Sequence, residues 1–151
     1  MSPNALLLVN LTATLFLTGL VWFLQLVQLP LFFSIGAAEL HSYVTRHRRR
    51  NTLLMAGPML VEIYTAVRLW RDASGWERGE LPGGNLFVAL LLLAIVWIVT
   101  FAWHMPQYGR LGRGDDDKAI HGLILSNWVR TACWTGRSAI MLWITAGHLR
   151  I

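Results

Sequence analysis

Residues 5–29 read ALLLVNLTATLFLTGLVWFLQLVQL, a stretch without a single charged side chain. About 20 consecutive apolar residues in a helix are enough to cross the hydrocarbon core of a bilayer. No Lys or Arg precedes this stretch, and it is longer than the core of a signal peptide, so we expect a retained membrane span. Similar stretches follow at residues 52–70, 84–105 and 119–146. The sequence therefore predicts an all-α fold, in which residues 1–151 form one integral membrane four-helix bundle.

The composition supports a membrane protein. Of the 151 residues, 55% are hydrophobic and 14% are charged, and the mean hydropathy is +0.48. Soluble domains contain a clearly larger charged fraction. The net charge of +5 lies mostly beside the apolar stretches, which favours contact with anionic lipid and argues against nucleic acid as a partner. The lone Cys133 excludes a disulfide framework within one chain.

The basic cluster Arg46-His47-Arg48-Arg49-Arg50 predicts the orientation in the membrane. Lys and Arg collect in short cytoplasmic loops. If the loop at about 44–51 is inside, the inner loops carry seven Lys and Arg residues, and the outer loop, an outer helix end and the C-terminus carry four. We therefore expect both termini on the outer, periplasmic side of a bacterial inner membrane, with anionic lipid at the Arg46–Arg50 loop.

Pro30 divides the first apolar region, because a proline inside a helix removes a hydrogen bond and clashes with the preceding turn. We expect residues 31–45 to form a short amphipathic helix at the inner surface; a continuation of the first helix is the alternative. Asp115, Asp116 and Asp117 precede the last span. Carboxylates there favour the positive end of a helix dipole, and a metal-binding acidic cluster is the less favoured interpretation.

Three charged side chains lie well inside the predicted spans, away from their ends: Glu62, Arg130 and Arg137. A charged group near the bilayer centre costs a few kcal/mol unless it is paired, so these groups should face one another inside the bundle. Counted from the outer ends of their helices, Glu62 and Arg137 lie at nearly the same depth. We therefore expect Glu62 to pair with Arg137. Arg130 is then left to a ligand, to Gln28, or to carbonyls freed near Pro58.

Four residues of the last span are spaced to share one helix face. They are Asn127, Arg130, Trp134 and Arg137, separated by steps of three and four residues. Such a face can be a buried polar network that fixes helix packing. It can also be a binding or catalytic site, which we favour because two arginines with one obvious acid leave cationic donors unused. Trp97 and Trp128, together with Trp134, are expected to face lipid as bulk, with a ligand pocket as the alternative.

Four histidines fall near the predicted inner ends of helices. Of these, His41, His104 and His121 are candidates for a metal or haem site, because neutral imidazoles at one level can ligate iron or copper. Histidines at helix ends are also common as dipole partners and interface residues, which is the favoured interpretation. The sequence identifies no cofactor.

The stretch TFAWHMPQYGRLGRGDDDKAIHGLILSNWVRT, residues 100–131, resembles a segment of the anthrone-oxygenase-like group of small four-helix membrane proteins. The shared elements are Pro106 after an apolar helix, a short polar loop, and Asn127 with Arg130 in the sequence NWVR. The resemblance implies a four-helix membrane fold and, for some members of the group, cofactor-independent oxidation of an aromatic polyketide. Only Asn127 and Arg130 carry over as site residues.

The leading hypothesis is an intramembrane polar site for a quinone-like or aromatic small molecule. Arg130 and Asn127 would hold an oxygen of this ligand, and Glu62 with Arg137 would brace the helices. If a reaction takes place, Arg130 would stabilise a developing phenolate or enolate without a metal. The alternative is a non-catalytic accessory subunit of a larger bioenergetic membrane complex, packed against partner membrane subunits. A proton-coupled transporter built around Glu62 is a third, less favoured hypothesis.

Overall fold

The computed structural model describes residues 2–75, 83–111 and 116–149. All elements in these ranges are helical and none is a strand, which confirms the all-α prediction. In chain order they are α1 (Pro3–Phe23), the π-helical turn η1 (Leu24–Gln28), the 3₁₀ turn η2 (Pro30–Ser34), α2 (Ala37–Gly75), α3 (Gly83–Val99), the π-helical turn η3 (Thr100–His104), α4 (Met105–Arg110) and α5 (Asp116–Leu149).

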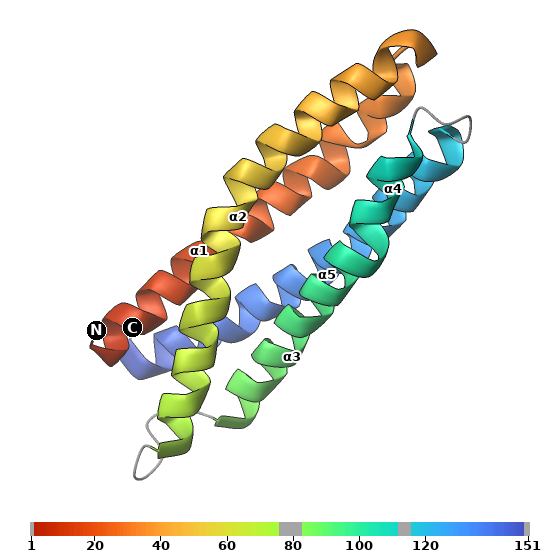
Figure 1. Ribbon diagram of the computed structural model, residues 1–151. Helices are drawn as coiled ribbons and strands as arrows, with labels where there is room; N and C mark the ends of the chain where they lie inside the picture. The colour runs from red at the N-terminus through yellow and green to blue at the C-terminus, as the bar shows by residue number, and fades with distance from the viewer. Residues whose placement is uncertain (1, 76–82, 112–115, 150–151) are drawn as a thin grey trace.

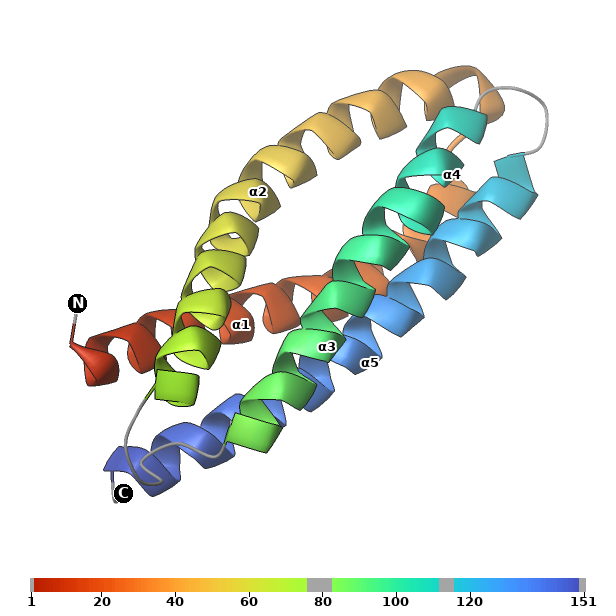
Figure 2. The ribbon, with the colours of Figure 1, turned by 60° about the horizontal axis from the view of Figure 1, so that its bottom comes forward.

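The elements form four long helical rods that pack lengthwise (Figures 1 and 2). One rod is α1 with η1, the next is α2, the third is α3 with η3 and α4, and the last is α5. The beginning of α1 and the end of α5 lie together at one end of the bundle (Figure 1), where His148 Nε2 is 2.9 Å from Asn4 Oδ1. Ser2 caps the first helix by accepting a hydrogen bond from the backbone N–H of Ala5 at 3.3 Å.

The expected helix at 31–45 and the expected loop at 44–51 are wrong. The chain reverses after η2, where Ile35 has extended backbone dihedrals, and from Ala37 onward one helix continues to Gly75. The basic cluster at residues 46–50 therefore lies within α2 and not in a loop. No glycine or proline interrupts residues 38–56, and Leu40 and Val44 are buried against Phe32, so the start of α2 is held by packing.

Prolines shape three of the rods. Pro58 lies inside α2, which arches away from the bundle axis in Figure 2. A proline cannot donate to the carbonyl four residues earlier and clashes with it, so a bend is expected there. The π-helical turns η1 and η3 each end two residues before a proline, Pro30 and Pro106. A wider turn relieves the same clash, and it also shifts the direction in which the side chains of η3 point.

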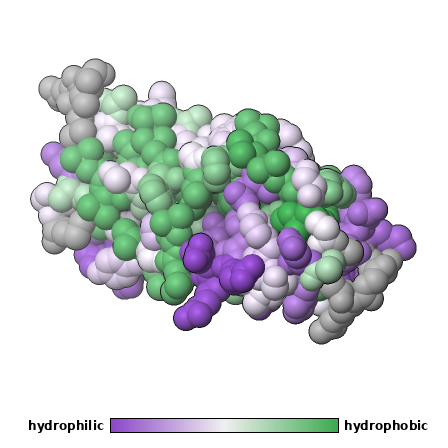
Figure 3. Space-filling model, turned by 90° about the horizontal axis from the view of Figure 1, so that it is seen from above, coloured by the Kyte–Doolittle hydropathy of each residue, from purple (hydrophilic) through white to green (hydrophobic). Residues whose placement is uncertain are grey.

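The bundle exposes many large apolar side chains, and it buries polar and charged groups as well as apolar ones. Large apolar side chains are exposed along every rod, for example Leu53 at 71% and Ile98 at 65%, whereas Glu62 is fully buried. Figure 3 shows hydrophobic side chains over much of one face, with hydrophilic ones gathered mainly toward its edges and ends. An exposed apolar surface around a polar interior is what a lipid environment favours.

Three helical segments in the described ranges are long and apolar enough to cross a membrane: Asn4–Ser34, Ala38–Asp72 and Gly83–Arg110. The expected span at 119–146 lies within α5, which is about as long but is not among the segments that meet this criterion of length and composition. Several of its polar residues are turned inward, since Ser126, Asn127 and Thr131 are all fully buried. The polarity of α5 therefore belongs to the interior of the bundle.

Candidate functional site

The ion pair expected between Glu62 and Arg137 is confirmed. Arg137 Nε donates to Glu62 Oε1 at 2.9 Å, and both side chains are at most 1% exposed. The other two guanidinium nitrogens are also bound: Nη1 donates to the backbone oxygen of Ala89 at 2.6 Å, and Nη2 donates to Asn10 Oδ1 at 3.0 Å. Arg137 of α5 thus connects to all three other rods.

The Glu62 carboxylate is equally satisfied. Besides Arg137, Thr14 donates to Oε1 at 2.8 Å, and the indole N–H of Trp134 donates to Oε2 at 3.1 Å. Asn10 donates to the backbone oxygen of Glu62 at 3.0 Å and to the hydroxyl of Thr65 at 2.7 Å. We call this set the Glu62 network: Asn10, Thr14, Glu62, Thr65, Trp134 and Arg137. Because its charges and donors are all paired inside the protein, it fixes the packing of the helices and has no free group for a ligand.

Arg130 lies on the same face of α5 but is bound quite differently. Its Nη1 donates to Asn127 Oδ1 at 3.1 Å, and its Nη2 donates to the sulfur of Met55 at 3.8 Å, a long and weak contact. Its Nε is buried without a hydrogen-bond partner in the described part of the chain. The guanidinium lies 5.2 Å from the centre of the Trp134 ring, and the residue is 2% exposed. No acid pairs with this buried cation among the described residues.

Asn127 is oriented toward Arg130 by its own contacts. Its amide nitrogen donates to the backbone oxygen of Val21 at 3.2 Å and to Gln25 Oε1 at 2.9 Å. These two bonds to the end of the first rod leave the amide oxygen for Arg130. The expectation that Asn127, Arg130, Trp134 and Arg137 share one face is confirmed, since all four are at most 2% exposed.

Arg130 lines a cavity of about 210 Å³ between α2, the α3–η3–α4 rod and α5. We call it the Arg130 cavity. Its walls are mainly apolar, with polar members from α2, η3 and α5. The residues that line it are Asn51, Thr52, Met55, Ala56, Met59, Leu60, Trp97, Thr100, Phe101, His104, Met105 and Arg130.

The π-helical turn η3 supplies the wall of this cavity opposite α2. His104, at its end, is 1% exposed, and its Nδ1 lies 2.7 Å from the hydroxyl of Ser126. That hydroxyl donates its hydrogen to the backbone oxygen of Leu123 at 3.0 Å, so it accepts from His104. In this arrangement a neutral ring carries its hydrogen on Nδ1 and Nε2 is an acceptor; in the other tautomer Nδ1 accepts from the Ser126 hydroxyl.

The other candidates lie away from Arg130. Gln28 donates to the hydroxyl of Tyr43 at 2.9 Å, and among the described residues it accepts no hydrogen bond from Arg130. His41 contacts the backbone oxygen of Leu111, and His121 packs on a phenylalanine ring at the surface, so neither joins His104. Within the described ranges no group of three or more His, Cys, Asp or Glu side chains is placed to hold a metal ion. Asp116 and Asp117 lie in the first turn of α5, and Asp115 is outside the described residues.

Two expectations need further correction. Trp134 does not face lipid: it is fully buried and belongs to the Glu62 network. Sequence reasoning also missed Asn10, Thr14 and Gln25, whose side chains complete the polar contacts of Glu62, Arg137 and Asn127. A signal for two of them was present, because Asn10 and Thr14 are polar residues four positions apart in a mainly apolar span, so they share a helix face.

No protein family, curated protein or solved structure matches this chain in the comparisons with known proteins. The functional argument therefore rests on the chain's own geometry.

Proposed function

We propose that this protein binds a quinone-like or aromatic small molecule inside the membrane, with Arg130 and Asn127 holding an oxygen of the ligand. The observation that carries this proposal is the buried Arg130 guanidinium, which within the described ranges has no acidic partner and an unpartnered Nε, and has a cavity beside it. Unpaired arginine donors are costly in hydrocarbon, and a ligand oxygen would satisfy them where lipid tails cannot.

The walls of the Arg130 cavity suit a flat apolar molecule. Trp97 and Phe101 supply aromatic surface on one side, and Met55 and Met59 supply adaptable thioether side chains on the other. Arg130 offers a planar set of donors, which can hold one oxygen from two nitrogens. A ring with a carbonyl or phenol group matches this combination better than a purely aliphatic chain does.

His104 allows chemistry beyond binding. Its acceptor Nε2 can take the proton of a phenol or of an activated C–H bond, while the electron pair that remains on the ligand oxygen is stabilised by Arg130. Transfer of electrons from such an anion to O₂ would be a cofactor-independent oxidation, the activity that the anthrone-oxygenase-like resemblance implies. Binding is the central proposal, and this reaction is its extension.

The proposed setting is a bacterial inner membrane crossed by all four rods. The exposed apolar surface supports this placement, and the inward polarity of α5 explains how a less apolar helix would also span. The basic segment 46–50 lies toward the end of the bundle opposite the termini (Figure 1). By the charge bias of membrane proteins this end would be cytoplasmic, and both termini periplasmic.

Retention of a bound molecule tests the proposal. The full chain would be purified in mild detergent, and bound apolar molecules would be extracted, identified by mass spectrometry and quantified. Arg130→Lys keeps the charge but loses the planar donor set, so we expect at least a tenfold loss of the retained molecule. Arg68→Lys, on the exposed face of α2, is the matched control and should retain it. Equal retention in both variants, with unchanged helix content, would disprove the role of Arg130.

The same purification examines the alternative, an accessory subunit of a bioenergetic complex. An accessory subunit should copurify with partner subunits, and its polar face should be filled by side chains. The cavity beside Arg130 favours the ligand-binding proposal over this alternative.

A further inference from the structure

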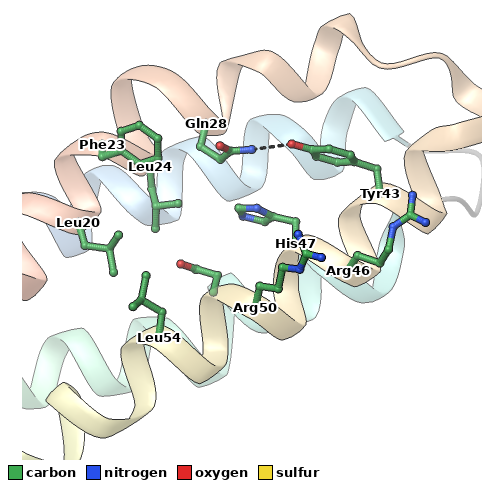
Figure 4. A pocket seen from close by; sticks show the side chains of 10 residues that line it. Leu20, Phe23, Leu24, Gln28, Tyr43, Arg46, His47, Arg50 and Leu54 are labelled. Carbon is green, nitrogen blue, oxygen red and sulfur yellow. Dashed lines mark hydrogen bonds between the residues drawn. The ribbon is translucent and has the colours of Figure 1, made fainter.

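A second cavity lies beside the basic segment 46–50 of α2, on the side that faces the first rod. It measures about 340 Å³ and is formed by the end of the first rod and the first half of α2 (Figure 4). Its polar end contains Arg46, His47 and Arg50, and its apolar end contains Leu20, Leu24 and Leu54. We call this cavity the arginine pocket. Figure 4 shows the two kinds of side chain separated along the pocket, with the leucines on the side toward the middle of α1.

The polar end has positive charge and donors that the protein does not use. Arg46 and Arg50 have no acidic partner within the described ranges. His47 Nε2 is buried without a hydrogen-bond partner in the same part of the chain. The hydrogen bond from Gln28 to the Tyr43 hydroxyl, at 2.9 Å, joins the two helices across the pocket (Figure 4). This end is therefore built to receive an anion with several oxygens.

We propose that the arginine pocket binds an anionic phospholipid, with its phosphate at Arg46, His47 and Arg50 and the start of an acyl chain along Leu20, Leu24 and Leu54. Guanidinium groups bind phosphate oxygens with paired, charge-assisted hydrogen bonds. The leucines extend the pocket toward the middle of α1. They would contact an acyl chain, whereas a free phosphate has no apolar part that could contact them.

This site is distinct from the surface attraction that any basic segment has for anionic lipid. Arg48 and Arg49 belong to the same helical turns as Arg46 and Arg50 but do not line the pocket. A diffuse attraction depends on the number of charges, whereas a built site depends on which side chains carry them. The inference uses the membrane placement proposed above, but it does not use the Arg130 cavity.

The test is lipid binding to the full chain, measured by native mass spectrometry in a neutral detergent. Phosphatidylglycerol is titrated, with phosphatidylcholine of the same chains as the neutral lipid. Losing the charge-assisted hydrogen bonds of one arginine should weaken binding about tenfold, so the double change Arg46→Gln with Arg50→Gln should lower phosphatidylglycerol affinity about 100-fold. The matched double change, Arg48→Gln with Arg49→Gln, removes the same charge and should lower it less than fivefold. All four arginines are exposed, so helix content and thermal unfolding should stay unchanged.

Equal losses in the two double variants would overturn the pocket and leave a diffuse attraction only. A third arm adds inorganic phosphate, or the water-soluble glycerophosphoglycerol headgroup, as competitor. Competition by either at the concentration of the lipid would overturn the lipid assignment, because the acyl chain would then contribute nothing. Arg130→Lys should leave lipid binding unchanged, so failure of the proposed ligand site and failure of this one give different results.

Discussion

The Glu62 network makes a quantitative prediction for Glu62→Gln. Glutamine keeps the size of the side chain, but it replaces one acceptor oxygen by an NH₂ group. Both oxygens of Glu62 accept hydrogen bonds, Oε1 from Arg137 and Thr14 and Oε2 from Trp134. Either orientation of the amide therefore sets its NH₂ against another donor, and Arg137 loses its counter-charge. Breaking a buried pair from one side typically costs about 3–5 kcal/mol, and we expect about 3 kcal/mol here.

The paired change Glu62→Leu with Arg137→Leu should be milder than either single leucine change, because no buried charge is left without its partner. It should still destabilise the protein, since Asn10 Oδ1 and the Ala89 carbonyl lose the donors that Arg137 supplies. The control is Asp72→Asn, which opens the exposed pair of Arg68 and Asp72, 3.6 Å apart. Exposed pairs contribute about 0–1 kcal/mol.

The assay is equilibrium unfolding in mixed micelles of a mild detergent and dodecyl sulfate, followed by circular dichroism. The free energy of unfolding is measured for the wild-type protein, both single leucine variants, the double variant, Glu62→Gln and the control. Strict additivity of the two leucine changes, within about 0.5 kcal/mol, would refute direct coupling between Glu62 and Arg137. A cost for Glu62→Gln no larger than that for Asp72→Asn would refute the magnitude.

Two further predictions concern topology and the Arg130 cavity. A C-terminal fusion to a protein that fluoresces only in the cytoplasm should stay dark, and a fusion to a phosphatase that is active only in the periplasm should be active; the reverse result would invert the proposed orientation. Ala56→Trp should fill the Arg130 cavity and lower the amount of retained small molecule at least tenfold, whereas Ala139→Trp, on the exposed face of α5, should not. Equal retention in these two variants would show that the cavity is not the ligand site.

Sequence reasoning predicted the features that follow from the cost of burying charge and from the position of a residue along its helix. Buried charge must be paired, and depth along a helix is proportional to residue number, so the Glu62–Arg137 pair could be predicted. The same rule left Arg130 without an acid, as the structure shows. The shared face of Asn127, Arg130, Trp134 and Arg137 followed from helical spacing alone.

The errors arose where packing between several helices determines the local structure. The loop at 44–51 was expected because basic residues usually mark loops, but α2 continues through them since Leu40 and Val44 pack on residues far away in the chain. His104 could not be separated from His41 and His121, because all three were expected near one level. Only the π-helical turn η3 and the contact with Ser126 distinguish it. Such contacts depend on tertiary packing, which spacing does not reveal.

The comparison of the two arginines shows why one cation is structural and the other is proposed to bind a ligand. Arg137 uses Nε, Nη1 and Nη2 on three different helices, so any ligand would have to break bonds that hold the bundle together. Among the described residues Arg130 has one full-strength bond, to Asn127, and that residue is itself held by the first rod. A ligand oxygen at Arg130 would add bonds without removing any. The cost of leaving those donors unsatisfied in the empty protein is then free energy that a ligand recovers on binding, which is why a weakly solvated oxygen on an apolar ring would suit the site.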